Sequence, residues 1–298
     1  MYFDDVPGAV FRPPGEANSF ILRVTSGCSH NRCTFCCMYK DVNFCIRPLP
    51  EIERQIARAA RFGQQVRRVF LADGDALALP TDVLLAILAR LKAAFPRLQR
   101  VASYAGPKNL LHKTTEELSH LRAAGLKLLY YGLESGDDEV LAYVNKGVSA
   151  SQAVLAGQKA VTAGFRLSLM VILGLGGCRW TKQHAEHTAQ AVSAIAPQLL
   201  NALTLMLYPG AALTAEYEAG RFTPLSPSEL AGELAQLLEA IVLPEGRHCL
   251  FRCDHVSNYI PINGVLPGDQ ARLAEEARAA QRALEKLLNW DPYNDVDG

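Results

Sequence analysis

The chain has 298 residues, of which 49% are apolar and 20% are charged, so it can build a large core and is not disordered as a whole. Thirty basic and thirty acidic side chains cancel, which argues against nucleic acid as a partner. A signal peptide begins with basic residues, and the first eleven residues of this chain contain none. The longest apolar run, residues 167–177, is too short for a membrane span. We therefore expect a cytoplasmic protein without membrane contact.

Short β-rich runs alternate with helical patterns along most of the chain. The predicted strands cover residues 20–26, 66–73, 98–104, 126–135, 166–174 and 201–209. The predicted helices cover residues 50–62, 81–95, 114–125, 138–144, 151–163, 181–196, 227–242 and 268–289. Such alternation is typical of parallel strands with right-handed crossovers, in an open or closed β/α barrel. We expect a barrel core over residues 1–210 and a C-terminal extension, residues 211–298, that caps it.

Five of the eight cysteines lie between Cys28 and Cys45, and the first three, Cys28, Cys33 and Cys36, are separated by four and two residues. Three thiolates on one loop can bind three irons of a [4Fe–4S] cube and leave the fourth iron open. Together with His30 they also make a Cys₃His set for zinc, although a structural zinc usually joins two knuckles. The spacing favours the cube and keeps zinc as the alternative.

A three-cysteine loop after the first strand of a β/α barrel resembles the radical S-adenosylmethionine (SAM) superfamily over residues 18–210, within it the Elp3/oxygen-independent coproporphyrinogen oxidase-like group. The resemblance implies a partial (β/α)₆ barrel and a [4Fe–4S] cluster on Cys28, Cys33 and Cys36. It further implies SAM on the open iron, cleaved to a 5′-deoxyadenosyl radical that abstracts a hydrogen atom. The family spacing is three residues and then two, so the departure keeps a 3-amino-3-carboxypropyl radical as an alternative.

The resemblance also assigns SAM contacts near the first two strands. Phe35 stands at the aromatic position that lies near the adenine in the family. Gly74 and Asp75 match the family's Gly-Gly-Glu motif, with Asp75 as a shorter acid for the SAM ammonium. From the residues alone, Phe35 also fits a core position, and Asp75 fits an Asx turn or a helix cap.

Glu134 ends the fourth predicted strand, where related enzymes hold the ribose hydroxyls. Strand alternation places Tyr130 on the same face as Glu134. Tyr130 is therefore a candidate for substrate contact or for a hydrogen-atom relay. A tyrosine packed inside the barrel is the alternative.

The fifth predicted strand has one apolar face and one mixed face that carries Arg166 and Ser168. A charged and a hydroxyl side chain inside a barrel need polar partners, which the SAM carboxylate or Glu134 would supply. The alternative for Arg166 is that it reaches solvent at the start of the strand.

Ile172 and Gly174, on the same mixed face, fit the Gly-x-Ile-x-Gly-x-x-Glu motif that contacts adenine in the family. Two positions of the motif differ, because its first glycine is Met170 here and its glutamate is Gly177. The motif therefore implies adenine contacts for Ile172 and Gly174 but no acid at position 177.

Other clusters lie outside these motifs. Cys249 and Cys253 are two thiolates, too few for a second cube, so we predict one cluster. His184 and His187 stand three residues apart, as expected for a solvated helix face, and the loop over residues 257–269 is predicted to cover the barrel mouth and select the substrate.

The expected partners are a small-molecule or peptide substrate and an electron donor of the flavodoxin or ferredoxin type. A hypothesis from another class is a zinc-stabilised binding module without catalysis.

Overall fold

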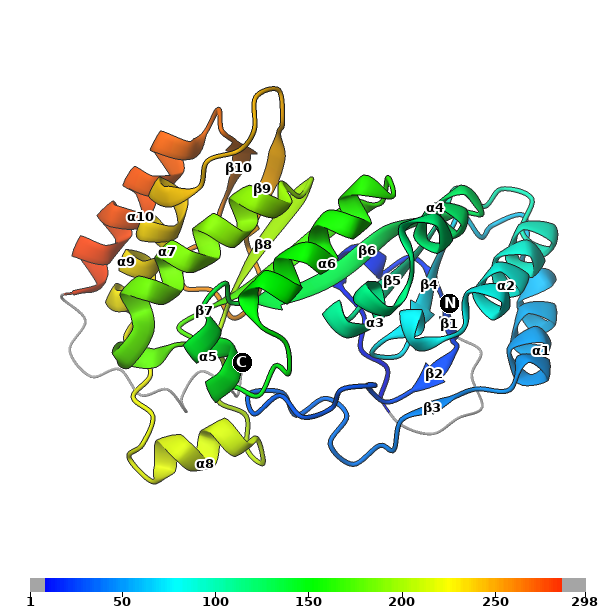
Figure 1. Ribbon diagram of the computed structural model, residues 1–298, viewed down its shortest axis with the longest axis horizontal. Coiled ribbons are helices and arrows are strands. Elements are labelled where there is room, and N and C mark those ends of the chain that lie inside the picture. Colours follow the sequence, from blue (N-terminus) through cyan, green and yellow to red (C-terminus); the bar gives the residue numbers. More distant parts are fainter. Residues whose placement is uncertain (1–8, 286–298) are drawn as a thin grey trace. The chain divides into compact units, whose positions relative to one another are not determined.

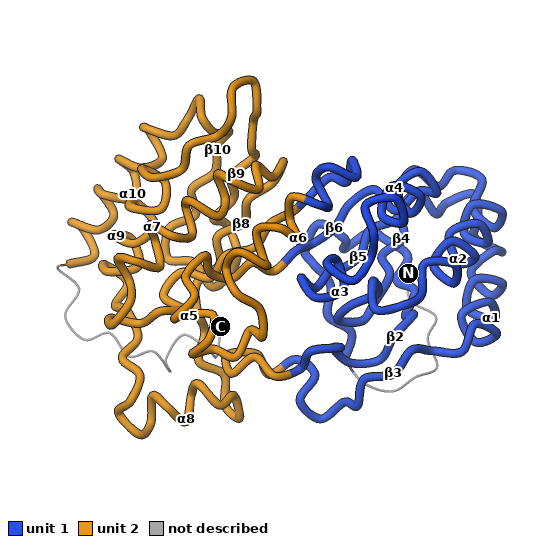
Figure 2. Tube along the Cα trace, viewed as in Figure 1, with its two compact units in different colours: residues 1–31, 38–131, 159–167 blue, residues 32–37, 132–158, 168–298 orange. Residues whose placement is uncertain are grey.

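The computed structural model describes residues 9–285 (Figure 1). Contacts within the chain define two compact units (Figure 2). The first takes the described residues up to 31 with residues 38–131 and 159–167, and the second takes residues 32–37, 132–158 and those from 168 on. This division falls within the sheet, and the predicted boundary near residue 210 stays a prediction.

The first unit contains the first three strands of the main sheet and the helices between them. Its elements are η1 (Pro14–Glu16), β1 (Phe20–Arg23), β2 (Thr25–Ser26), β3 (Cys45–Ile46), α1 (Leu49–Ala60), β4 (Arg68–Ala72), η2 (Ala76–Ala78), α2 (Thr81–Ala94), β5 (Arg100–Ala105), α3 (Pro107–His112) and α4 (Thr115–Ala123). Three further elements are shared between the units: β6 (Leu126–Glu134), α6 (Ala150–Thr162) and β7 (Arg166–Leu173).

The second unit continues with strands and helices that reach to the end of the described chain. Its elements are α5 (Asp138–Tyr143), α7 (Gly177–Ile195), β8 (Leu199–Thr204), α8 (Ala212–Glu218), α9 (Pro227–Ala240), β9 (Cys249–Cys253), β10 (Ile262–Leu266) and α10 (Gln270–Leu284). The helix predicted over residues 268–289 is thus α10, and residues 286–289 lie outside the described residues, as do residues 1–8.

The main sheet has eight strands in the order β1-β4-β5-β6-β7-β8-β9-β10. Its pairs β1–β4, β4–β5, β5–β6, β7–β8 and β8–β9 are parallel. This confirms the α/β class and the partial barrel of parallel strands. Because parallel strands end at one edge of the sheet, the residues after each strand gather at that edge.

Two strands extend the sheet beyond the six that the sequence predicts. β9 pairs in parallel with β8, and β10 pairs antiparallel with β9. In β9 the side chains of Cys249, Phe251 and Cys253 are buried and alternate with more exposed ones. The C-terminal extension therefore supplies two strands to the sheet in addition to its helices.

Residue patterns explain where the helices begin and which faces they bury. The side chain of Thr114 accepts a hydrogen bond from the Glu117 amide in a capping box, as the predicted start of that helix requires. The residue before α2 is Pro80, which makes no side-chain hydrogen bond to cap the helix, and neither Thr81 nor Asp82 takes the cap position. The Thr81 hydroxyl instead donates to Glu117 Oε1 at 2.7 Å and joins α2 to α4.

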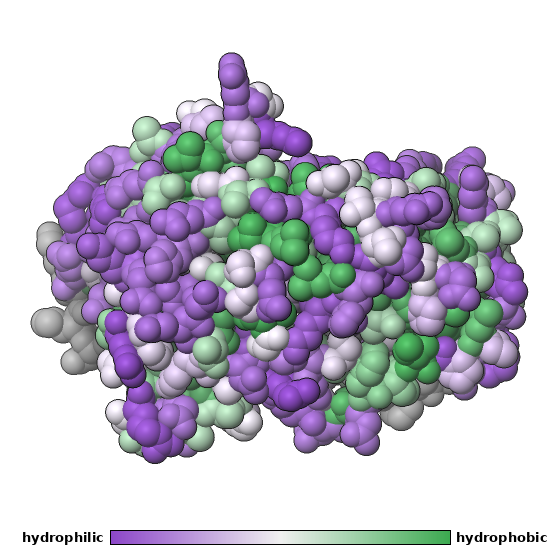
Figure 3. Space-filling model, in the orientation of Figure 1, coloured by the Kyte–Doolittle hydropathy of each residue, from purple (hydrophilic) through white to green (hydrophobic). Residues whose placement is uncertain are grey.

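Of the helices in the described part of the chain, none combines the length and the apolar character that crossing a membrane requires. On the face shown in Figure 3, hydrophilic and hydrophobic residues are interspersed.

Candidate functional site

The three cysteines of the motif follow β2 on an irregular loop. None of them forms a disulfide, and all three are partly exposed. Among residues 9–285, no three His, Cys, Asp or Glu side chains are placed to share a single metal ion. In a cube each thiolate binds its own iron, whereas a single zinc ion needs all of its ligands around one point.

Backbone contacts hold the loop on both sides of the middle cysteine. In the first unit, Asn31 has a φ of 42° and its side chain donates to the Tyr39 carbonyl at 2.6 Å. In the second unit, the Thr34 amide donates to the Val144 carbonyl at 3.0 Å, and its carbonyl accepts from the Leu213 amide at 2.9 Å. Each part of the loop is therefore held by contacts within its own unit.

The turn after β4 touches the start of the cysteine loop. The Gly74 amide donates to the Gly27 carbonyl at 3.0 Å. A Cβ atom at position 74 would lie 2.9 Å from Cys28 Cβ, closer than carbon atoms pack. Position 74 therefore requires glycine, and the predicted cofactor residue Gly74 directly contacts the predicted iron ligand Cys28.

Asp75 is buried beside this contact. Its Oδ2 accepts hydrogen bonds from Asn109 Nδ2 at 2.6 Å and from the Ser29 hydroxyl at 3.2 Å. Its Oδ1 is buried and has no hydrogen-bond partner among the described residues. Burial raises the pKa of Asp75, and the hydrogen bond from Asn109 opposes that shift. A buried carboxylate oxygen without a partner is costly, and a ligand ammonium would satisfy it.

Residues after β5 complete the surroundings of Asp75 and were not predicted. Asn109 lies on α3, and its amide also donates to the Ser29 hydroxyl at 3.1 Å. A Cβ atom at Gly106 would lie 2.4 Å from Asp75 Oδ2, so this glycine makes room for the carboxylate. Gly106 and Asn109 could have been found from the sequence, because both lie in the polar run that follows the third predicted strand.

Glu134 ends β6 with a φ of 65°, in the left-handed region that disfavours non-glycine residues. Its Oε1 accepts a hydrogen bond from Lys146 Nζ at 2.9 Å, and both side chains are largely buried. A Cβ atom at Gly132 would lie 2.0 Å from the same oxygen, so the carboxylate packs over that glycine. Lys146, which was not predicted, fixes the direction of the carboxylate.

Phe35 and Ile172 pack against one apolar cluster in the second unit. The cluster consists of Val140, Val144 and Leu175, all fully buried. The two residues that the resemblance assigns to adenine are therefore brought together around a common apolar surface. Both are only partly buried, which leaves part of each side chain available.

Two predicted cofactor residues on β7 have other roles in the structure. Ser168 is buried, and its hydroxyl accepts a hydrogen bond from Asn201 Nδ2 on β8 at 2.9 Å. Arg166 is exposed at the first residue of β7, whereas Glu134 is the last residue of β6. These positions favour the alternative for Arg166, a side chain in solvent at the start of its strand, and they give Ser168 a polar partner on β8, so the assignment of both to the cofactor stays a prediction that we do not carry further.

Tyr130 also has a structural partner. Its hydroxyl donates to Glu16 Oε1 at 2.8 Å, and the fully buried Glu16 also accepts from Arg100 at 2.5 Å. Its ring makes edge-to-face contacts with Phe70 and Tyr104. Burial, and then the nearby Glu16, raise the pKa of Tyr130 well above its ordinary value. The hydroxyl is therefore a neutral donor inside the first unit, as expected for a tyrosine packed in the barrel.

The histidine pair on α7 divides between the interior and the surface. His187 is exposed, and its Nδ1 lies 2.6 Å from Asp137 Oδ2. His184 is buried, so the prediction that both lie on a solvated face is wrong for His184. The reason is that α7 buries a wide face, which includes Ala185 and Thr188.

The loop predicted over residues 257–269 is only partly a loop, because residues 262–266 form β10; the loop after β9, which precedes β10, is tied to the end of β8. Asn258 Oδ1 accepts from the Thr204 hydroxyl at 2.9 Å, and its Nδ2 donates to the Ala202 carbonyl at 2.8 Å. The Thr204 amide donates to the Ser257 hydroxyl at 3.1 Å. Because β9 is parallel to β8, this loop leaves the sheet at the carboxyl ends of both strands.

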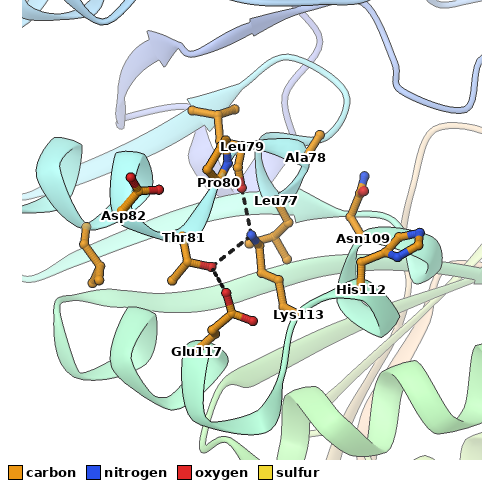
Figure 4. Close-up of a pocket in the computed structure, with 11 residues that line it drawn as sticks. Leu77, Ala78, Leu79, Pro80, Thr81, Asp82, Asn109, His112, Lys113 and Glu117 are labelled. Atoms are coloured by element: carbon orange, nitrogen blue, oxygen red, sulfur yellow. Dashed lines mark hydrogen bonds between the residues drawn. The ribbon is translucent and has the colours of Figure 1, made fainter.

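A cavity of about 700 Å³ lies between the turn after β4 and the helices α2, α3 and α4 (Figure 4). Asn109 lines it, together with Lys113, Thr81 and Glu117. Lys113 Nζ donates to the Leu79 carbonyl at 2.7 Å and to the Thr81 hydroxyl at 3.2 Å, and burial lowers its pKa. These polar groups satisfy one another's hydrogen bonds, and so they stabilise the side of the cavity next to Asn109.

Comparisons with known proteins find a matching family model and similar chains. Residues 22–192 match the family model described as the radical SAM superfamily. The heme chaperone HemW of Bacillus subtilis (strain 168) is 22% identical over 226 residues, which cover 72% of this chain and 59% of that protein. The chain thus spans less than two thirds of the length of this curated relative.

Solved structures share the fold at low sequence identity. Methylornithine synthase (PylB) is 16% identical, with a TM-score of 0.53 over 87% of this chain and 68% of that one. Coproporphyrinogen III oxidase (HemN) from Escherichia coli is 18% identical, with a TM-score of 0.54 over 74% and 50%. The methyltransferase TsrM from Kitasatospora setae, solved with tryptophan and a SAM analogue, is 17% identical, with a TM-score of 0.59 over 89% and 62%.

Proposed function

Because this chain belongs to the radical SAM superfamily, whose members use a [4Fe–4S] cluster and SAM, we propose that it is a radical SAM enzyme with Cys28, Cys33 and Cys36 as the iron ligands. When bound, the cluster and SAM supply a reductive C–S cleavage that yields a 5′-deoxyadenosyl radical able to remove a hydrogen atom from a substrate. The residues of this chain bind and orient the cofactors and exclude water around them.

The observation that carries this proposal is the buried carboxylate of Asp75: the backbone of Gly106 and Leu77 lies near it, but its Oδ1 makes no hydrogen bond of good geometry among the described residues. The ammonium group of SAM can donate hydrogen bonds, and its positive charge stabilises the ionised form of a buried carboxylate. Asn109 and Ser29 occupy Oδ2 and so leave Oδ1 as the acceptor for the ligand. Gly74, in contact with Cys28, sets this carboxylate next to the cysteine loop.

The remaining contacts follow from the second unit. Phe35 and Ile172 offer apolar surface for the adenine, and Gly174 offers backbone at the end of β7. Lys146 holds Glu134 Oε1, which leaves the other carboxylate oxygen to accept from a ribose hydroxyl. We do not include Tyr130, Arg166 or Ser168 in this set, for the reasons given above.

The substrate of this enzyme is a small molecule or a peptide, and the loop after β9 selects it at the end of β8. The bonds that fix Asn258 to β8 support this role, because a selecting loop must be held in place. A flavodoxin or ferredoxin type of protein supplies the electron. The protein acts in the cytoplasm, where such donors are found.

A second candidate function is heme binding. The observation that favours it is the similarity to the heme chaperone HemW over 72% of this chain. Titration of the protein with hemin, followed by the Soret absorbance, tests it. A saturable complex formed without SAM cleavage would support the chaperone role in place of the enzyme.

One experiment tests the main proposal against its alternatives. The protein is reconstituted anaerobically with iron and sulfide, reduced with dithionite and incubated with SAM, and the products are separated by chromatography. We expect a brown protein that forms 5′-deoxyadenosine. Methylthioadenosine as the main product would instead indicate the 3-amino-3-carboxypropyl radical, and a colourless zinc protein without product would indicate the binding module.

A further inference from the structure

The turn that connects β7 to α7 is held by helix α9 of the C-terminal extension. α9 packs against α7 (Figure 1). A Cβ atom at Gly174 would lie 2.9 Å from Leu230 Cδ2, and one at Gly177 would lie 2.6 Å from the Thr223 carbonyl oxygen. Position 177 therefore has no room for a side chain, and position 174 favours glycine because its φ is 78°.

Glu233, one helical turn after Leu230, supplies a carboxylate to this turn. The Gly174 amide donates to Glu233 Oε1 at 2.6 Å, and the Thr181 hydroxyl donates to Oε2 at 2.6 Å. The Glu233 side chain is only 1% exposed, so its charge is removed from water. A buried carboxylate is tolerated only when donors satisfy it, which makes these two bonds a specific arrangement.

His184 extends the arrangement to the end of β6. Its Nε2 lies 3.0 Å from the Ile172 carbonyl oxygen and 3.7 Å from Glu233 Oε1, and its Nδ1 lies 2.8 Å from the Ser135 hydroxyl. A carbonyl only accepts, so Nε2 carries a proton and donates to Ile172. Nδ1 faces the Ser135 hydroxyl, whose oxygen accepts from the Asp137 amide at 3.0 Å.

We propose that Glu233 is a positioning residue for SAM: it holds the backbone at the end of β7 in the conformation that receives the adenine. Glu233 binds the amide of Gly174, and His184 binds the carbonyl of Ile172. Gly174 and Ile172 are the two residues of β7 and its turn that we propose to contact adenine. The inference rests on the proposed function, and it gives the C-terminal extension a role in cofactor binding.

The arrangement is more than general packing because charge is buried where an apolar side chain would fit. Leu230 already fills the space over Gly174 from the same helix face, one turn before Glu233. The carboxylate adds two directed hydrogen bonds to the turn and leaves the core contacts of α9 to its many buried apolar residues. Loss of the Glu233 carboxylate should therefore make the turn between β7 and α7 more mobile and should have a smaller effect on the stability of α9.

The test compares Glu233→Gln and Glu233→Ala with the wild type and with Glu239→Gln, an exposed control on the same helix that pairs with Arg278. Each cluster-loaded protein is assayed for iron content, for thermal unfolding and for SAM affinity by equilibrium dialysis without reductant. Glutamine keeps one acceptor for the Gly174 amide but loses the second carboxylate oxygen. We expect SAM affinity to fall about three-fold in Glu233→Gln and at least about ten-fold in Glu233→Ala, with iron unchanged, as the loss of one and then two charge-assisted hydrogen bonds predicts.

Thr181→Ala provides a milder variant in case Glu233→Ala does not fold, because Thr181 is only partly buried. It should weaken SAM binding in the same direction as Glu233→Gln. A lower unfolding temperature with unchanged SAM affinity in the folded variants would overturn the inference and make Glu233 a structural residue only. A wild-type protein that loads iron but binds no SAM would instead refute the proposed function.

Discussion

Asn109 Nδ2 and Asp75 Oδ2 lie 2.6 Å apart, and this hydrogen bond joins the residues that follow two neighbouring strands of the sheet. It occupies one oxygen of the carboxylate and fixes its plane. The other oxygen is buried and keeps its capacity to accept. The bond therefore orients the acid as well as stabilising it, as a site for a cation requires.

Asp75→Asn should weaken SAM binding at least about ten-fold, because the amide keeps the shape of the side chain but lacks the charge that pairs with an ammonium. The measurement is equilibrium binding to the cluster-loaded protein, with iron content determined in the same sample. Asp82→Asn is the matched control, since Asp82 lies nearby in the first turn of α2 but is exposed. Equal SAM affinity in the wild type and Asp75→Asn would remove Asp75 from the site.

The pH dependence of folding should report the same group. Burial raises the pKa of Asp75 above its ordinary value of 3.8, so the folded state binds a proton more tightly than the unfolded state does. Its contribution to stability is therefore full below pH 3.8 and is lost as the pH rises through the raised pKa. SAM favours the ionised carboxylate, so its affinity should rise over the same window. Both trends should be absent in Asp75→Asn, as denaturant titrations and binding measured across this pH range would show.

Removal of any cluster ligand should abolish bound iron. Cys28→Ala, Cys33→Ala and Cys36→Ala each leave two thiolates, which hold a cube poorly. Iron and sulfide analysis after reconstitution measures the effect. Cys45→Ala and Cys178→Ala are the controls, because both residues are exposed cysteines outside the motif. Full iron content in Cys33→Ala would refute the assignment.

The sequence was sufficient for the features that depend on local pattern. Alternation of strands and helices predicts the parallel pairs β1–β4, β4–β5, β5–β6 and β7–β8. The spacing of Cys28, Cys33 and Cys36 predicts their role as iron ligands, which stays a prediction. The strand pattern also predicts that Asp75 comes shortly after a strand and that Glu134 ends one, as they do at β4 and β6. These inferences need only neighbours in the chain and the rules of parallel sheets.

Features that depend on distant partners were beyond the sequence. Ser168 needs a polar partner by its pattern, but nothing local shows that Asn201 provides it. Glu233 lies 59 residues from Gly174, on a helix whose pattern gives no sign of a buried charge. β9 is only five residues long and follows a turn, so its alternation is too short to separate a strand from irregular chain.

Tyr130→Phe should leave SAM cleavage unchanged and lower the free energy of unfolding by about 1 kcal/mol, the usual value of one hydrogen bond. Glu16 keeps its other donors, Ser19 and Arg100, when the Tyr130 hydroxyl is removed. Urea denaturation measures the stability, and 5′-deoxyadenosine formation measures the cleavage. Glu16→Gln should cost more, because it also removes the charge that pairs with Arg100. Loss of 5′-deoxyadenosine in a folded Tyr130→Phe variant would return this tyrosine to the reaction.

Cys249 and Cys253 lie on the buried face of β9, and their environment disfavours the thiolate. Burial raises the pKa of both thiols to about 12, with the Asp254 charge adding to the effect at Cys253. Iron binding at this site would have to supply the free energy to form two buried thiolates. The prediction of a single cluster can be tested by iron analysis.

Reconstitution should accordingly yield about four irons per chain, the content of one cube. Cys249→Ala and Cys253→Ala should keep that content and lose about 1–2 kcal/mol of packing each. In the native protein, iodoacetamide should modify the exposed Cys45 well before either buried thiol, since only the thiolate reacts. About eight irons, with a fall in Cys253→Ala, would show instead that metal binding overcomes the burial of these thiols and that β9 carries a second site.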